Sequence, residues 1–413
     1  MSAAEAEPDR QSILHAGVAR CVVTPDPLIP ISRGMGDCRA AKEAIGDLEV
    51  RVLVLQQGAL RVALASMPFI GWSTPLCARV RGLVPGIPPE NILFAATHTH
   101  SGPDTYGFPN AHGGYAIDMD YLAATCERTA ETIQAALNAC EPVEVRVATG
   151  EAFGKIAYNV YAPDFYDPRC GVLQCLRPDG SILATVINYA CHPEVMSSAE
   201  VCSPDFIGPL YDFVDARTGG TTLFVNGAQG GLVTADDRGI EADSERWAEC
   251  VRIGELLGSE ALRIIAGAPF QSAPTLWCAA HPITFPVCPS MAALMSTLHP
   301  VVMQGYSIPE EATSYTVQQN VINLGNSQWV TIPGEPLPNV GYYLKRKMHG
   351  EHNFLLGITN DGLGYFLSRV DYDSFKAYDY ITLTSLHELA GEHLIDATLA
   401  LVNAAPRPEP LAP

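Results

Sequence analysis

Short apolar runs alternate with longer amphipathic stretches along most of this chain, and one run stands out because two histidines come soon after it. Residues 92–96 are apolar and are bounded by residues that break regular structure, which predicts a buried strand. The run leads into Thr97-His98-Thr99-His100, and residues 101–103 then turn the backbone. Because alternate side chains of a strand share one face, we expect both imidazoles to reach a common cleft. Hydrogen-bonded histidines at a strand-to-loop junction would give the same pattern.

The same kind of pattern predicts regular structure throughout the chain. Strands are expected at residues 16–23 (an edge strand), 48–56, 60–66, 143–148, 171–176, 181–188, 221–226, 314–324, 328–332 and 354–359. Helical periodicity marks residues 74–84, 119–138, 240–266, 336–348 and 382–403. No repeat, linker or charge run divides the chain. We therefore expect an α/β fold of mixed β-sheets flanked by helices, in a single domain over residues 1–413 with tails at 1–13 and 404–413.

Composition narrows the possible partners. Hydrophobic residues make up 47% of the chain and charged residues 17%, as in a well-buried globular protein. The formal net charge of −20 argues against nucleic acid or an anionic membrane as a partner, because both require a basic surface. A small neutral or cationic substrate fits this charge.

Cysteine usage and the N-terminus bear on location. The 12 cysteines include no Cys-x-x-Cys pair, which is typical of reduced, mostly buried thiols in a reducing compartment. Residues 1–10 are polar and acidic, without the basic start and apolar core of a secretory signal. No stretch reaches the roughly 20 apolar residues of a membrane span. The cytoplasm is therefore the expected location.

Other predicted strands are also followed by residue types that commonly bind metals. His192 follows the strand at 181–188, and Glu335 follows the strand at 328–332. The apolar strand at 221–226 leads into a glycine-rich turn at residues 227–231. Because α/β folds bind ligands in the loops at strand ends, we expect these segments to lie near one another.

These segments, taken in order, resemble the motifs of neutral ceramidases. The resemblance rests on AGVAR at 16–20 with VTP at 23–25, THTHSGP at 97–103, His192-Pro193, GAQG at 227–230, PGE at 333–335 and NDGLGY at 360–365. It extends from about residue 15 to residue 402. It implies a ceramidase-like catalytic domain with a zinc ion held by His98, His192, Glu335 and Tyr365. Imidazole and carboxylate ligands suit zinc, and an open coordination position would be left for water or substrate.

The resemblance also implies roles in proton transfer. It places His100 near the zinc-activated water and the developing oxyanion, so His100 is the first candidate for a proton carrier. Tyr365, or a carboxylate such as Glu194 or Asp205, would assist it. Asp205 could equally brace His192. Backbone N–H groups of residues 227–231 could cradle an oxyanion or a substrate carboxylate, because glycine allows close approach.

Two departures from the ceramidase pattern fall at the family's catalytic serine and at an arginine that lines its substrate site. Ceramidases follow Gly-Ala-Gln-Gly with Asp-Val-Ser-Pro, whereas residues 231–234 here read Gly-Leu-Val-Thr, which puts Val233 at the serine position. The arginine of the family's Asn-Arg pair is replaced by Val160, which follows Asn159. We therefore expect a substrate other than ceramide, contacted by Gly230, Gly231 and Asn159.

The sequence thus predicts a zinc-dependent hydrolase that cleaves an amide, ester or lactone bond of a small molecule with a metal-activated water. Two alternatives remain open. One is a metal-dependent lyase or isomerase that stabilises an enolate. The other is a non-catalytic sensor that keeps its metal only for folding. The sequence determines neither the bond type nor the oligomeric state.

Overall fold

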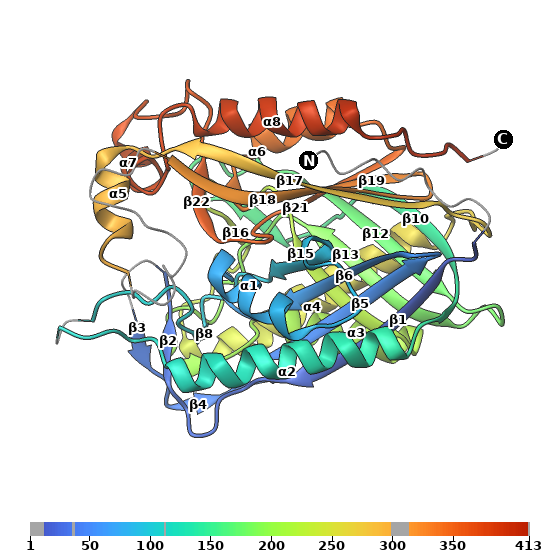
Figure 1. Ribbon diagram of the computed structural model, residues 1–413. Coiled ribbons are helices and arrows are strands. Elements are labelled where there is room, and N and C mark those ends of the chain that lie inside the picture. The colour runs from blue at the N-terminus through green and yellow to red at the C-terminus, as the bar shows by residue number, and fades with distance from the viewer. Residues whose placement is uncertain (1–11, 35–37, 111–112, 299–313, 412–413) are drawn as a thin grey trace.

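Three β-sheets form the centre of the protein in a computed structural model that describes residues 12–34, 38–110, 113–298 and 314–411 (Figure 1). The first sheet has the strand order β7 (Ile92–Ala96), β6 (Leu60–Met67), β5 (Glu49–Gln57), β1 (His15–Val22) and β9 (Glu141–Pro142). The second has the order β10 (Glu144–Glu151), β12 (Arg169–Leu176), β13 (Ile182–Tyr189) and β15 (Thr221–Asn226). The third has the order β17 (Leu276–Pro286), β18 (Ser314–Leu324), β19 (Ser327–Thr331) and β21 (His352–Leu356).

One hydrophobic core lies between the three sheets. It includes Leu53 from the first sheet, Val186 from the second and Phe354 from the third. Along β5, Leu53 and Leu55 enter this shared core, whereas Val52 and Val54 face a separate core under the covering helices. Alternate side chains of one strand therefore serve two hydrophobic layers, and strands buried on both faces have near-continuous apolar sequences.

Helices cover the outer face of each sheet. Those described are α1 (Thr74–Leu83), α2 (Met119–Asn138), α3 (Ile207–Thr218), α4 (Asp243–Ile265), α5 (Pro289–Met295), α6 (Pro338–Lys347), α7 (Asp379–Leu383) and α8 (Ala390–Ala404). α2 packs on β1 and β5, α4 packs on β10 and β12, and α8 packs on β17. In Figure 1, α2 and α8 consequently lie on opposite sides of the molecule. None of the described helices is long and apolar enough to cross a membrane.

Short strand pairs and 3₁₀ turns complete the described structure. The pairs are β11 (Ala157–Asn159) with β16 (Val233–Ala235), β14 (Val201–Cys202) with β4 (Glu43–Ala44), and β20 (Gly334–Pro336) with β22 (Leu363–Phe366). A three-stranded group has the order β3 (Cys38–Ala40), β2 (Pro30–Ser32) and β8 (Gly102–Pro103). The 3₁₀ turns are η1 (Pro89–Asn91) and η2 (Lys376–Tyr378).

The mixed α/β fold predicted from the sequence is confirmed, and α2 and β7 have the predicted bounds. The single helix expected at 382–403 is wrong, because α7 ends at Leu383 and α8 begins at Ala390. The N–H of Gly391 donates to the carbonyl of Leu367, which fixes the start of α8 against the preceding segment. β1 is not an edge strand, since β9 pairs with its first two residues. Within the predicted tails, residues 1–11 and 412–413 lie outside the described residues.

Candidate metal centre

The candidate site forms where strands from all three sheets end. β7 leads to His98 and His100, and β13 leads to His192. The segment after β19 continues into β20, which contains Glu335. The three sheets therefore bring side chains from distant parts of the sequence to one place, as expected for ligand sites at strand ends.

Asn226, the last residue of β15, ties two of these strand ends together. Its Oδ1 accepts from the N–H groups of Cys191 and Gly227 at 3.1 and 3.0 Å. Its Nδ2 donates to the carbonyls of Thr97 and Cys191 at 3.2 and 2.9 Å. Thr97 and Cys191 directly precede His98 and His192, so one fully buried amide sets the relative positions of both histidines.

His98 reaches the site through a backbone conformation that strand alternation does not predict. β7 ends at Ala96, and His98 has a φ of 72°, in the left-handed region that is uncommon for residues other than glycine. Its N–H donates to Phe69 at 2.9 Å, and its Nδ1 is hydrogen-bonded to the carbonyl of Ile70. The expected common cleft for His98 and His100 is therefore produced by a turn, and the expected strand geometry is wrong.

Carbonyl partners determine which ring nitrogens face the site. A carbonyl oxygen only accepts hydrogen bonds, so the Nδ1 atoms of His98 and His192 must donate to Ile70 and Val233, the latter at 2.8 Å. The Nε2 atoms are then the nitrogens that can offer a lone pair when the rings are neutral. Fixing the tautomer in this way is a regular feature of metal-binding histidines.

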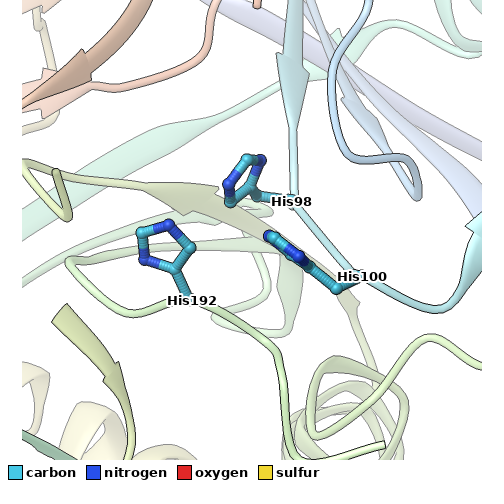
Figure 2. Close-up of side chains that lie close together, drawn as sticks. All are labelled: His98, His100 and His192. Carbon is cyan, nitrogen blue, oxygen red and sulfur yellow. The ribbon is translucent and has the colours of Figure 1, made fainter. Parts of the chain in front are cut away.

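Glu335 faces both of these Nε2 atoms. Its Oε2 lies 3.0 Å from Nε2 of His192, and its Oε1 lies 3.5 Å from Nε2 of His98. The rings of His98, His100 and His192 converge in Figure 2, and their closest ring nitrogens all lie within 4.8 Å of one another. All three histidines are buried.

His100 differs from the other two histidines in its surroundings. Its Nδ1 is 2.9 Å from the carbonyl of Arg33, to which it donates, and 3.4 Å from Oε1 of Glu194. Its Nε2 is buried and has no hydrogen-bond partner among the described residues. Glu194 also forms a hydrogen bond with the side chain of Thr234. His100 therefore has one fixed nitrogen and one nitrogen available to a ligand or a proton.

Burial and charge move the pKa values of these groups in different directions. Burial, together with the neighbouring His100 and His192, holds the pKa of His98 well below its usual value. Burial also lowers the pKa of His192, but the hydrogen bond to Glu335 and its negative charge outweigh this and raise that pKa to about 9. Opposite charge nearby favours the protonated imidazole, so His192 carries a proton at neutral pH in the metal-free protein.

Tyr365 approaches from the strand next to Glu335. β20 and β22 run parallel, and Glu335 and Tyr365 are partners in their register. Tyr365 is buried, and burial followed by the charge of Glu335 raises the pKa of its phenol well above the usual value. The positive charge of a bound metal would act in the opposite direction and favour the phenolate.

The residues at the site fit a divalent metal ion. Two imidazoles with fixed tautomers, a buried carboxylate and a nearby phenol converge there, and a buried Nε2 of His100 has no protein partner among the described residues. Nitrogen and carboxylate ligands of this kind suit zinc. The ligand roles of His98, His192, Glu335 and Tyr365 stay predictions, because the geometry also brings His100 within reach of the same point.

A largely apolar cavity of about 140 Å³ adjoins the histidines and Glu335. Tyr106, Tyr365 and Tyr380 line it near the site, together with the segment at residues 361–364. On another side it is lined by Met291 and its neighbours around α5. A pocket with apolar walls and a few convergent polar groups is the usual form of a small-molecule site.

Comparisons with known proteins identify the architecture. Neutral ceramidase from Pseudomonas aeruginosa superimposes on the chain with a TM-score of 0.76 at 16% sequence identity, covering 98% of this chain and 77% of the ceramidase. The chain has the fold of the neutral ceramidases. A ceramidase complexed with C2 gives the same TM-score at 15% identity and the same coverage. No family model and no curated protein sequence matches the chain.

The backbone of Val233, the residue expected from the sequence to replace the serine of the ceramidase motif, orients His192. Its carbonyl accepts from both the N–H and the Nδ1 of His192, each at 2.8 Å. Its side chain is fully buried in the core under α3 and α4. Thr234 is the neighbouring residue with a hydroxyl, and it contacts Glu194.

The three residues expected to bind substrate mainly make contacts within the protein. The N–H of Gly230 donates to Pro336 at 3.0 Å, and a Cβ at Gly230 would lie 2.4 Å from the carbonyl oxygen of Glu335. Gly231 has a φ of 71°, which favours glycine. Asn159 accepts from the N–H groups of residues 161 and 162 and donates to Phe165, which closes a local turn. Contact of Gly230, Gly231 and Asn159 with substrate stays a prediction.

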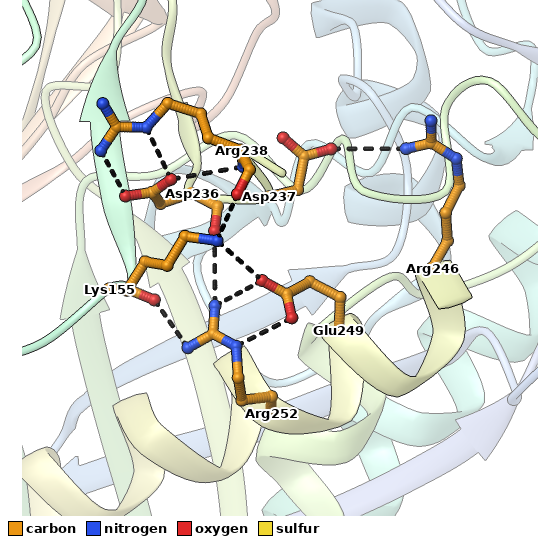
Figure 3. A network of polar contacts seen from close by, with 7 residues as sticks. All are labelled: Lys155, Asp236, Asp237, Arg238, Arg246, Glu249 and Arg252. Carbon is orange, nitrogen blue, oxygen red and sulfur yellow. Dashed lines mark hydrogen bonds and ion pairs between the residues drawn. The ribbon is translucent and has the colours of Figure 1, made fainter. Parts of the chain in front are cut away.

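A charged network holds the segment that follows Val233, as Figure 3 shows. Arg238 pairs with Asp236 through two bonds of 2.8 and 2.7 Å, and Lys155 donates to the carbonyl of Arg238 at 2.7 Å. Arg252 on α4 bonds to the carbonyls of Lys155 and Asp236 and to the carboxylate of Glu249. These contacts fix the loop after β16 against α4, and so support the backbone that orients His192.

Proposed function

We propose that this protein is a metal-dependent hydrolase that cleaves an amide, ester or lactone bond of a small molecule. His98, His192 and Glu335, with Tyr365, would hold a zinc ion. Such an ion supplies an activated water molecule and polarises the substrate carbonyl. The observation that supports this most directly is the convergence of two Nε2 atoms on the carboxylate of Glu335, with both Nδ1 atoms fixed by carbonyls.

His100 is the group best placed to move a proton in this reaction. Its Nδ1–H donates to Arg33, so Nε2 carries the free lone pair, and His100 lines the cavity with this nitrogen unpaired among the described residues. Nε2 can accept a proton from the attacking water and deliver it to the leaving group. The carboxylate of Glu194, 3.4 Å from Nδ1, would stabilise the imidazolium formed between these two steps.

The two other assisting groups considered from the sequence have different surroundings. Asp205 is fully buried and accepts from the N–H groups of Met196 and Phe206, each at 2.7 Å. These bonds brace the segment after His192 and favour a structural role for Asp205. Tyr365 lines the cavity, and its phenol could bind the metal or stabilise negative charge on the substrate oxygen.

The shared fold with a ceramidase supports hydrolysis, while two residues argue against ceramide as the substrate. In the motif resemblance, Val160 and Val233 would stand where the family has its arginine and serine. Val160 is 47% exposed and has no charge with which to bind a polar head group, and Val233 has no hydroxyl. A reaction that depends on activated water, without a nucleophilic side chain, is compatible with both replacements.

Metal analysis and turnover of the purified protein test this proposal. We expect about one zinc ion per chain and zinc-dependent hydrolysis of aryl esters or anilides, with one ¹⁸O atom from labelled water in the acid product. A product free of solvent oxygen would favour a lyase or isomerase. A metal whose removal lowers only the melting temperature, with no turnover of any substrate in the panel, would favour the non-catalytic sensor.

A further inference from the structure

The cavity beside the metal centre is enclosed on one side by a short helical segment. Met291 and Met295 lie on α5, and Leu294 and Leu298 extend the same surface. Met291 and Met295 are buried, with 6% and 7% of their surface exposed. His98, His100 and Glu335 line the same cavity. An atom bound at the metal centre would therefore stand next to an apolar space.

Several polar groups around this cavity are hydrogen-bonded to one another, whereas Oγ of Ser73 and Nε2 of His100 have no partner among the described residues. Oδ2 of Asp361 accepts from the hydroxyls of Tyr315 and Thr74 at 2.9 and 2.5 Å, and its Oδ1 accepts from the N–H of Gly362 at 2.7 Å. The hydroxyl of Tyr106 donates to the carbonyl of Gly362 at 2.8 Å. A polar or charged group entering the cavity would lose its hydration without a matching partner from these hydrogen-bonded groups, which is unfavourable.

The volume of the cavity limits what can enter. An apolar cavity of about 150 Å³ in another protein accommodates benzene. The cavity here measures about 140 Å³. It therefore has room for one six-membered ring or a chain of about six carbons beside the metal centre.

We propose that this cavity selects substrates whose scissile carbonyl carries a compact, uncharged, apolar group. This inference rests on the proposed hydrolysis and names the substrate class for the same site. A group much larger than this would contact Met291 and Met295 of α5, which line the cavity. Methionine side chains are flexible and adapt to different shapes. Met291 and Met295 therefore limit the size and polarity of the substrate group that enters the cavity, but they do not select its exact shape.

A series of linear alkyl hydroxamates tests this size limit by binding. The hydroxamate binds zinc and directs its alkyl chain into the cavity, so affinity for the zinc-loaded protein can be measured by calorimetry from two to twelve carbons. We expect affinity to rise about fourfold per methylene up to about six carbons and then to stop rising or fall. Affinity that keeps rising to twelve carbons, or that does not depend on chain length, would overturn the proposal.

A matched pair of variants tests whether side chains of α5 set the maximum chain length that the cavity accepts. Met295 and Met348 are both 7% exposed and lie in the same hydrophobic core, but only Met295 lines the cavity. Met295→Ala should move the optimum chain to longer lengths, and Met348→Ala should leave it unchanged. If Met295→Ala does not fold, Leu294→Ala, at a half-buried position, should give the same shift. An unchanged optimum in the folded cavity variant contradicts the assignment.

The binding series separates this inference from the proposed function. A clear length optimum in a protein that turns over no ester, amide or lactone would leave the cavity assignment intact and reject hydrolysis. Hydrolysis that is fastest with long-chain acyl substrates would support hydrolysis and reject the compact-group assignment.

Discussion

Nε2 of His192 lies 3.0 Å from Oε2 of Glu335, although 143 positions separate the two residues in the sequence. Burial alone would lower the pKa of His192, but Glu335 raises it to about 9. The metal-free protein therefore keeps a proton at the point where the proposed metal ligands meet. A metal ion must displace that proton, because a histidine ligand has to be neutral at the coordinating nitrogen.

Zinc affinity should therefore rise with pH. Below pH 9, most of the metal-free protein has a protonated His192, so the apparent affinity should increase about tenfold per pH unit and level off near pH 9. Competition with a chelator between pH 6.5 and 9.5 measures this slope, and a pH indicator measures the proton released. In Glu335→Gln the pKa of His192 should fall, so the rise should level off at lower pH and at a weaker affinity. An affinity independent of pH between 7 and 8.5 contradicts this.

The histidines should separate into two classes on substitution. His98→Ala and His192→Ala should abolish stoichiometric zinc binding, because each removes an Nε2 that faces Glu335. His100→Ala should keep the zinc and the melting temperature but lower kcat by about 100-fold or more, as expected for loss of a proton carrier. Elemental analysis and steady-state kinetics measure both effects. His281→Ala, at an exposed position on β17, is the control. Loss of zinc in His100→Ala would make His100 a ligand.

The absence of a side chain at Gly230 should be required for Glu335 to occupy its position beside the histidines. A Cβ at Gly230 would lie 2.4 Å from the carbonyl oxygen of Glu335, so Gly230→Ala must push β20 away from the histidines. We expect a loss of about 1–3 kcal/mol in stability and about 10–100-fold in zinc affinity. Gly267→Ala is the matched control, because a Cβ there meets nothing within 4 Å. Equal zinc affinities in the two variants would show that Glu335 does not depend on this contact.

The sequence predicted much of the fold because hydrophobic periodicity reports which faces are buried. β7 and α2 were placed correctly, since the strand is buried on both faces and the helix has one buried face. The break between α7 and α8 was missed, because it depends on the contact of Gly391 with Leu367, which periodicity does not contain. Tertiary contacts of this kind override local propensity.

The sequence also named the residues that meet at the site, but not how they are held. The φ of 72° at His98 and the carbonyls of Ile70 and Val233 are backbone features, which residue types do not reveal. Asn226 was missed as well. A buried asparagine at the end of an apolar strand, directly before glycine, was the available signal, because such a side chain must find hydrogen-bond partners.

Substitution of Asn226 tests whether its hydrogen bonds to the segments before His98 and His192 determine zinc affinity, separately from their effect on overall stability. Asn226→Ala leaves the N–H groups of Cys191 and Gly227 and the carbonyl of Thr97 without this side-chain partner. We expect a loss of about 2–4 kcal/mol in the free energy of unfolding, since buried polar groups lose their hydrogen bonds. Because these groups adjoin His98 and His192, zinc affinity should fall at least tenfold.

Asn188→Ala is the control for that experiment. Asn188 is equally buried and donates to the carbonyls of Val225, Asn226 and Leu355, which lie inside the sheets and do not directly precede the histidines. Its replacement should cost a similar amount of stability, because a comparable number of buried hydrogen bonds is lost. Zinc affinity should change by less than about threefold, since the segments at Thr97 and Cys191 keep their bonds to Asn226. Chemical unfolding and zinc competition on both variants give the comparison. If the two variants lose stability and zinc affinity in the same proportion, the metal site follows global stability and the amide of Asn226 has no special part in positioning the histidines.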